Sequence, residues 1–305
     1  MRVRVLLVSS ALVALSPVVA AAQEYSGGVT LGYGHTDVSD SDTDANILTL
    51  DGRFGVDLGN GLRFGADISG ANVDIDGAAD DLDQSVVGIY GAYGFANGTS
   101  AGLYVERADV DVDVDDDLTL TSYGLMLGYE AEGAALGGFY GESDTDPALP
   151  NGGAVQDYGV TFRYTGAEGY TVGASALRTE ISSNGRELNY DFAGIAGSYA
   201  VAPSWTLFGG LSDISLDELE LDVTTLGLGV SYDLSAVSRA NASVSLEVAR
   251  SETEVAGFEG DATSVRLGLS IPLGSRGFAV PMNSVADSVL NPRHSAMSTS
   301  MMSAY

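Results

Sequence analysis

The sequence predicts an all-β fold, an antiparallel up-and-down β-barrel of about 14 strands that spans a membrane. Apolar residues alternate with small or polar residues across residues 23–274, which is typical of strands whose two faces meet different surroundings. Short turns alternate with longer acidic connections, and aromatic residues gather beside the short turns. The 305 residues would allow two globular domains, but this single repeated pattern indicates one.

Composition limits the class of protein. The chain has 42 acidic residues against 13 arginines and no lysine, and its net charge of −29 argues against nucleic acid as a partner. Cysteine is absent, which excludes disulfides and cysteine-ligated metal sites. Hydrophobic content is nevertheless 45%, so acidic and apolar residues must be segregated from each other in the fold.

Residues 1–22 are expected to be a secretory signal peptide. Arg2 and Arg4 precede an apolar run from Val5 to Leu15, and three alanines at residues 20–22 form a small-residue cleavage site. The alternative is a membrane anchor, which needs a longer uninterrupted run than the one that Pro17 breaks here. Residues 23–274 are therefore the expected barrel domain of an exported protein.

The first strands show the alternation most clearly. From Tyr25 to Gly34 the odd positions are largely apolar, and the even positions are small. Apolar residues recur at every second position from Leu48 to Leu58, with a gap at Gly52, and again from Leu62 to Ile68. The Asn-Gly turn between these two runs is a strong hairpin signal. Later apolar faces lie within residues 87–95, 123–129, 158–164, 226–234, 242–248 and 265–273.

Two stretches are less regular, residues 134–142 and residues 188–200. In the second of these, Phe192 and Ile195 fall out of phase with each other. Loss of one hairpin would leave roughly 12 strands, and roughly 16 is the other open value.

The connections differ at the two ends of the predicted strands. Short ones lie at residues 59–60, 97–98, 130–133, 166–169, 201–204 and 235–239. Longer acidic ones lie at residues 38–45, 73–83, 109–117, 143–155, 182–187, 217–220 and 254–261. This asymmetry is typical of transmembrane β-barrels, whose short turns face the periplasm. The surplus acid is then expected in the outer loops, and the apolar side chains face lipid.

Aromatic residues support a membrane barrel over a soluble β-sandwich. They are predicted to lie at one height, as an interfacial girdle does, whereas a sandwich needs no such ring. The members of this girdle are Tyr93, Phe95, Tyr129, Tyr164, Tyr170, Tyr199, Trp205 and Tyr232.

Short motifs add a family resemblance. The segments Gly55–Asp67 and Leu226–Leu234 resemble strand-and-turn phrases of the Gram-negative general porin family, and Arg266–Leu273 resembles the signal that the barrel-assembly machinery reads. The resemblance implies an outer-membrane location and a diffusion channel. Two features depart from the family: the third outer loop, residues 109–117, is too short to fold into the pore, and a tail, residues 275–305, follows the assembly signal.

The predicted inner face indicates a water-filled channel. Its positions are mostly Gly, Ala, Ser and Thr, as at Gly88, Ser122 and Gly227, and a barrel wider than about 8 strands leaves space inside. We therefore expect a porin for passive diffusion of small hydrophilic solutes and ions. The alternative is a non-conducting structural or adhesive barrel that presents acidic surface loops.

Charged residues are expected to line this pore. Acids outnumber arginines there, which predicts a weak preference for cations, and the alternative is a ladder of ion pairs that satisfies itself. The expected pore-lining residues are Arg53, Arg63, Arg163, Arg266, Asp51, Asp67, Asp233 and Glu247.

Three further arginines, Arg107, Arg178 and Arg250, are predicted to point outward near the outer ends of their strands. Arginine on the lipid-facing side is tolerated near the interface, so we expect contacts with lipopolysaccharide phosphates. The alternative is that they reach into water or pair with Glu106 or Glu180. Outer-membrane lipid and lipopolysaccharide are thus expected partners, and a homo-oligomer is left open.

No enzymatic or metal site is predicted. Asp111, Asp113 and Asp115 alternate with valines and are only weak calcium candidates, because on a strand their carboxylates simply share one solvated face. His35 and His294 are the only histidines, and we see no arrangement of serine or aspartate with them of the kind that an outer-membrane lipase or protease needs. We expect no cofactor. The tail, residues 275–305, is expected to be a poorly ordered periplasmic segment, and whether it plugs the lumen or hangs free is left open.

Overall fold

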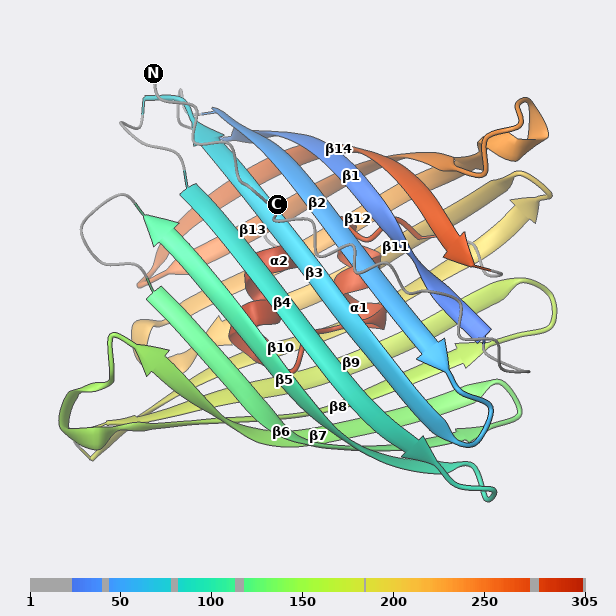
Figure 1. Ribbon diagram of the computed structural model, residues 1–305. Coiled ribbons are helices and arrows are strands. Elements are labelled where there is room, and N and C mark those ends of the chain that lie inside the picture. Colours follow the sequence, from blue (N-terminus) through green and yellow to red (C-terminus); the bar gives the residue numbers. More distant parts are fainter. Residues whose placement is uncertain are drawn as a thin grey trace, which may run out of the picture.

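The computed structural model is a closed barrel of 14 antiparallel strands (Figure 1). It describes residues 24–39, 44–77, 82–112, 118–183, 185–274 and 280–303, so the expected signal peptide lies outside the described residues. The strands are β1 (Glu24–Val38), β2 (Asp44–Asp57), β3 (Leu62–Ile75), β4 (Leu82–Gly94), β5 (Thr99–Val112), β6 (Leu118–Ala131), β7 (Ala134–Asp146), β8 (Ala154–Thr165), β9 (Tyr170–Ser183), β10 (Arg186–Ala202), β11 (Trp205–Leu216), β12 (Leu221–Asp233), β13 (Ser243–Val255) and β14 (Phe258–Gly274).

Each strand pairs with its neighbours in sequence, and β1 closes the sheet by pairing with β14. Val29 lies opposite Ile271 and Leu31 opposite Leu269 in this closing pair. Closure leaves no open sheet edge, which is required in lipid because unpaired backbone groups find no water there. The predicted fold class and the strand number of 14 are confirmed.

Both irregular stretches form strands, β7 and β10. The phase break in β10 arises because the two apolar residues concerned lie on opposite faces of the strand. Phe192 points into the barrel and is 1% exposed, whereas Ile195 points outward and is 61% exposed. An inward-facing apolar residue is thus what broke the pattern in this strand.

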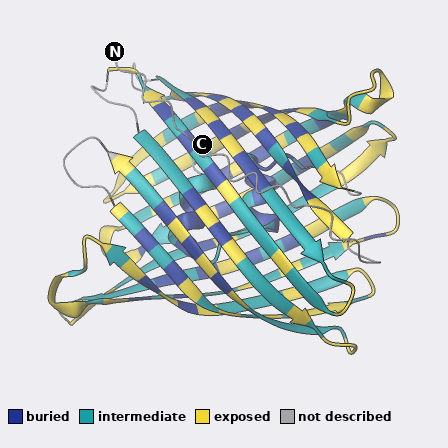
Figure 2. Cartoon of the chain, viewed as in Figure 1, coloured by how far each residue is buried: buried dark blue, intermediate teal, exposed yellow. Residues whose placement is uncertain are grey.

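Elsewhere the two faces follow the predicted alternation (Figure 2). Thr30 and Asp51 are buried inside, while their neighbours Leu31 and Leu50 are 48% and 44% exposed on the outside. Large apolar side chains therefore form the outer surface, as a lipid-facing band requires. No helix in the described ranges is long and apolar enough to cross a bilayer.

The connections differ from the expected pattern of short turns and long loops. Expected loop residues 182–187 and 254–261 mostly continue the strands, so residues 184–185 and 256–257 are all that join those hairpins. The strand pairing continues into the expected loop residues, as in the pair of Leu221 and Val255 at the end of the β12–β13 ladder. Within the described residues, acidic side chains consequently gather on strand ends at the rim where these connections lie, which we call the acidic rim.

The opposite rim, which we call the short-turn rim, carries the aromatic residues. Ring pairs form there between Trp205 and Tyr232, with centroids 4.6 Å apart, and between Tyr164 and Tyr170 at 5.9 Å. Tyr93, which packs on Phe95, is 44% exposed to the outside. This ring of outward aromatics is the arrangement expected at a membrane–water interface.

The described part of the tail lies inside the barrel, where Figure 1 shows α1 (Val285–Leu290) and α2 (Ala296–Ser303) in red. Val285 and Ala286 are fully buried, as is Ala296 at the start of α2. This arrangement differs from the expected poorly ordered periplasmic segment. The physical reason is that the inner wall offers apolar surface, ionic partners and enough space for two short helices.

Candidate functional site

The lumen is the candidate functional site, and residues 280–303 occupy part of it. We refer to these residues as the tail plug. Its helix α1 lies against β9, β10 and β11, and α2 lies against β9 and β10 nearer the acidic rim. The backbone nitrogen of Met282 donates to Oγ1 of Thr30 at 3.3 Å, and that of Ala296 donates to Oγ1 of Thr179 at 3.1 Å. The plug is thus tied to opposite sides of the wall.

Glycines of the inner wall allow the close approach of α1. A Cβ atom on Gly210 would lie 2.9 Å from the backbone nitrogen of Ala286 and 3.0 Å from its Cα. A Cβ atom on Gly227 would lie 2.8 Å from Cγ2 of Val285. The small inner residues that the sequence indicated as the lining of an aqueous channel are therefore also what admits the helix.

Apolar side chains hold both helices. One buried cluster joins Val289 and Ala296 of the plug to Leu177, Phe192 and Ile214 of the wall. A second wall cluster near the acidic rim consists of Val86, Ala108, Leu120 and Val155, and it packs against Met297, Met301 and Met302 of the plug. Burial of apolar surface stabilises such contacts without any directional requirement. The apolar contacts of α2 thereby lie on the side of the acidic rim.

The sequence pattern did not reveal this apolar inner wall. Val86 and Val87 are adjacent in β4, and only the second can face lipid. Two neighbouring apolar residues in an alternating strand are the signal that one of them packs inside. In β10 an inward apolar residue, Phe192, gave a related signal, a break in the alternation with Ile195.

Arg53 links the wall to the plug. Its Nε donates to Oδ1 of Asp67 at 3.0 Å, and its Nη1 and Nη2 donate to the two carboxylate oxygens of Asp287 at 3.2 and 3.1 Å. Nη1 of Arg293 lies 3.5 Å from Oδ1 of Asp67. These contacts form one chain of ion pairs in which the two wall groups, Arg53 and Asp67, lie between the two plug groups, Asp287 and Arg293.

A second anchor is formed by Glu247 and Arg266, which lie opposite each other on β13 and β14. Nη1 of Arg266 lies 3.5 Å from Oε2 of Glu247, and the backbone nitrogen of Val285 donates to Oε1 of Glu247 at 3.2 Å. Both charged side chains are almost fully buried. Because a buried carboxylate needs partners, the plug completes the surroundings of this pair.

Arg163 projects from β8 on another side of the lumen. Its Nη2 donates to the carbonyl oxygen of Leu290 and to Oδ1 of Asn291, at the C-terminal end of α1. A cation at this end of a helix is favourable, because the last carbonyl groups carry a partial negative charge. Five of the expected pore-lining groups are thus close to or bonded to the plug, namely Arg53, Asp67, Arg163, Glu247 and Arg266.

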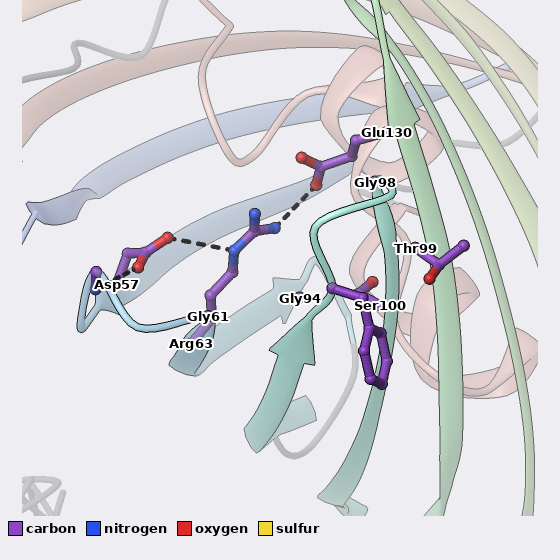
Figure 3. A pocket seen from close by; sticks show the side chains of 10 residues that line it. Asp57, Gly61, Arg63, Gly94, Gly98, Thr99, Ser100 and Glu130 are labelled. Carbon is purple, nitrogen blue, oxygen red and sulfur yellow. Dashed lines mark hydrogen bonds and ion pairs between the residues drawn. The ribbon is translucent and has the colours of Figure 1, made fainter.

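The remaining expected residues have separate surroundings. Asp51 is buried on the inner face of β2, next to the chain of ion pairs. Arg63 lies at the short-turn rim between Asp57, 3.3 Å from its Nε, and Glu130, 3.0 Å from its Nη1 (Figure 3). The structure does not bring Asp233 together with these groups, because its exposed side chain accepts a hydrogen bond from the backbone of the β12–β13 connection.

Several lumen residues were missed by sequence reasoning. The ring of His294 stacks on Tyr104 with centroids 4.0 Å apart, and its Nδ1 lies 3.7 Å from Oε2 of Glu106. Asp157 is fully buried and accepts a 2.6 Å hydrogen bond from Thr179. Parity along β5 places Glu106 inside, so counting positions from the strand's outward residues could have found it.

The half of the lumen on the side of the short-turn rim is hollow. One cavity of about 360 Å³ lies around Arg63 at the rim itself (Figure 3). Another of about 370 Å³ lies below α1, and its lining includes Arg53, Tyr90, Arg163 and Leu290. Two cavities therefore lie on this side of the tail plug, and the second is bordered by the plug itself.

The three outward arginines each bind an aspartate on the outer surface. Arg107 lies 2.8 Å from Asp109. Arg178 lies 2.6 Å from Asp191, and Arg250 lies 2.9 Å from Asp261. These partners differ from the expected Glu106 and Glu180, since Glu106 points into the lumen.

The described residues contain no group of three or more acidic or histidine side chains arranged to hold a metal ion. Of the weak calcium candidates, Asp111 lies near the end of β5. Asp113 and Asp115 lie outside the described residues. His35, the barrel histidine, lies 3.1 Å from Oδ1 of Asn46 through its Nδ1.

Comparison with solved structures finds outer-membrane channels. The anion-selective porin from Comamonas acidovorans has a TM-score of 0.52 at 11% sequence identity, over 83% of this chain and 100% of that chain. The deltaS2 mutant of the TodX monoaromatic hydrocarbon channel has a TM-score of 0.52 at 12% identity, over 85% of this chain and 91% of that chain. No protein-family model matches the sequence, and no curated protein matches it.

Fold and surface together define the class of protein. A closed barrel of 14 strands with an apolar outer band matches proteins of the Gram-negative outer membrane, and the chain is an outer-membrane β-barrel with a channel-like architecture. The likeness at these identities defines the fold alone. The resemblance of the short motifs to general porins is thus supported at the level of a shared barrel, with no sequence family assigned.

Proposed function

We propose that this chain is an outer-membrane channel for passive diffusion of small hydrophilic solutes, and that its own tail plug closes the channel. One observation carries the proposal: cavities at the short-turn rim and below α1 lie beside a plug whose described residues share no backbone-to-backbone hydrogen bond with the wall. A plug held in this way can move without unpairing a strand. Barrels of about 8 strands are filled by their own side chains, and a 14-stranded barrel without its plug is wider.

The wall left behind by a displaced plug suits water and small polar solutes. Inner positions such as Ser122, Thr225 and Ser264 carry hydroxyl groups, and the glycines between them leave the path wide. Acidic side chains outnumber arginines on the inner wall of the described strands. We therefore propose a weak preference for cations, exerted over about one Debye length.

Planar-bilayer recording tests the proposed channel. The full chain is compared with a chain that ends at Gly274, after both have been shown to be folded by their heat-sensitive gel mobility and circular dichroism. We expect rare steps from the full chain and frequent, larger steps from the shortened chain. A folded shortened barrel that gave no steps would refute the channel.

A specific observation favours one alternative, a non-conducting barrel with a structural role. The methionine side chains of α2 fill the half of the lumen at the acidic rim against an apolar wall, as a permanent core would. A permanent core predicts that the shortened chain loses stability and stays closed. The same recording therefore separates the two functions.

We also propose that Arg107, Arg178 and Arg250 contact lipopolysaccharide phosphates. Arg107 and Arg250 are about 60% exposed although each binds an aspartate, so their guanidinium groups remain accessible from the membrane side. Arginine binds phosphate and carboxylate through the same planar set of donors.

A further inference from the structure

Arg163 differs from the other inward-facing arginines of the described residues in its bonding partners. Among the inward-facing arginines of the described residues, Arg53, Arg63, Arg266 and Arg293 each form an ion pair with a carboxylate. Arg163 forms none within the described part of the chain, and its partners there are a backbone carbonyl and an amide oxygen. The carboxylate of Asp287 borders the same cavity but forms its ion pair with Arg53. A guanidinium group that is partly withdrawn from water and lacks an ion pair of its own favours the arrival of an anion.

Donors on Arg163 remain for such an anion. Within the described chain, its hydrogen bonds to Leu290 and Asn291 both leave from Nη2. Nε and Nη1 are left for other acceptors. Arg163 also lines the cavity of about 370 Å³ below α1, so a solute in that cavity can reach these donors.

The tail plug shows which anion this wall accepts. Arg53, which lines the same cavity, binds the carboxylate of Asp287 with two nitrogens. One of the two arginines of the cavity, Arg53, thus already binds a carboxylate. The second, Arg163, forms no ion pair with an acidic side chain among the described residues.

The rest of the cavity lining determines what the ligand carries besides its carboxylate group. Its lining combines the ring of Tyr90 and the side chain of Leu290 with the hydroxyl groups of Thr171 and Ser198. Ligand sites in proteins measure about 300–1,000 Å³ and join apolar surface to a few polar anchors. We propose that this cavity binds small monocarboxylates with a short apolar or aromatic body, and that Arg163 binds their carboxylate group.

This site deepens the proposed channel and rests on it for its biological use, because it lies on the path between the short-turn rim and the plug. Binding itself needs no conduction. A site of this kind would hold a permeating carboxylate at the plug while the overall field of the wall still favours small cations.

Isothermal titration of the full-length folded barrel with benzoate tests the site. The buffer has low salt and a non-ionic detergent, and empty micelles serve as the blank. Benzamide, which has the same shape without the charge, is the matched ligand, and inorganic phosphate is the second anion. We expect saturable binding of one benzoate per barrel, with much weaker binding of benzamide and of phosphate.

Variants assign the binding to Arg163. Arg163→Gln should weaken benzoate binding roughly ten- to a hundred-fold, because it removes a hydrogen-bonded charge. Arg239→Gln removes the same charge from an exposed turn at the short-turn rim and should leave binding unchanged. Arg163→Lys keeps the charge and loses the planar donors, so it should bind with intermediate affinity, and it provides the test if the glutamine variant does not fold.

Equal binding of benzamide and benzoate, or benzoate binding that survives both Arg163 variants, would overturn the proposal. Stronger binding of phosphate than of benzoate would overturn the ligand class. These results are independent of the channel test. If the full-length barrel binds benzoate but the shortened barrel does not conduct, the channel is refuted and the binding site is supported. If the shortened barrel conducts but the full-length barrel does not bind benzoate, the channel is supported and the binding site is refuted.

Discussion

Arg53 on β2 and Asp287 on α1 form a two-pronged ion pair across the lumen, although they are 234 positions apart in the chain. The carboxylate of Asp287 is only 6% exposed, so water screens the pair weakly. Removing one partner of a buried pair leaves the other charge uncompensated, which costs more than the pair contributes when intact. The contact is therefore a polar tie between the wall and the tail plug whose loss should be costly.

Replacing Asp287 by asparagine should loosen the plug. Arg53 keeps Asp67 as a partner, so the barrel wall should remain folded. A hydrogen bond to a charged group contributes about 1.5–3 kcal/mol, which predicts that conductance steps of the full chain become roughly ten- to a hundred-fold more frequent in a planar bilayer.

Asp217→Asn provides the matched control, since this acid lies exposed between β11 and β12. It should leave the step frequency of the full chain unchanged. An Asp287→Asn barrel that opened no more often than this control would show that the ion pair does not hold the plug in place.

Gly210→Val should act on the plug and spare the wall. The three atoms nearest to a Cβ at this position all belong to Val285 or Ala286 of the plug. Overpacking costs about 1–3 kcal/mol, so the full chain should lose thermal stability in circular dichroism and open more often. In the chain that ends at Gly274 the same substitution should be neutral, because valine suits a strand.

Gly70→Val is the control for this comparison, because the nearest atom to a Cβ there is a backbone oxygen of Gln84 at 3.8 Å. It should change neither form. Equal destabilisation of the full and shortened chains by Gly210→Val would place its effect in the barrel wall and argue against plug displacement.

The fold was predictable because its determinants are local. Alternation around Leu31 and Leu50 places each residue on a face, and the Asn-Gly turn after β2 fixes the first tight hairpin. The plug was not predictable, because its contacts join distant segments. Parity places Arg53 on the inner face, but nothing local to either residue indicates that its partner is Asp287. Small inner residues are likewise compatible with a lumen filled by water or by a packed helix, and only the three-dimensional structure distinguishes these two arrangements.

Ion selectivity of the shortened chain is expected to favour potassium over chloride. The rim acids Asp57 and Glu130 share a single arginine, Arg63, which leaves a local excess of negative charge at the mouth. The Debye length falls from about 10 Å at 0.1 M salt to about 3 Å at 1 M, so the preference should be weak at the lower concentration and lost at the higher one. Reversal potentials in a potassium chloride gradient measure it, and a preference for chloride at low salt would contradict the prediction.

Three arginines on the outer surface are expected to bind lipopolysaccharide. Simultaneous replacement of Arg107, Arg178 and Arg250 by glutamine should weaken the packing of lipopolysaccharide around the barrel, because each guanidinium group offers charged donors to phosphate. Cells that depend on this barrel should become several-fold more sensitive to detergent and to large antibiotics, a change of the order expected when about 1 kcal/mol of surface interaction is lost.

Arg186→Gln and Arg239→Gln together are the control, because both arginines lie exposed on connections or strand ends away from these three aspartate pairs. Purified barrels should also retain less lipopolysaccharide in the triple variant than in this control. Equal retention and equal sensitivity would mean that the pairs with Asp109, Asp191 and Asp261 are the whole role of the three arginines. Their charge would then serve the barrel's own cross-strand contacts, and lipid packing would depend on the apolar band alone.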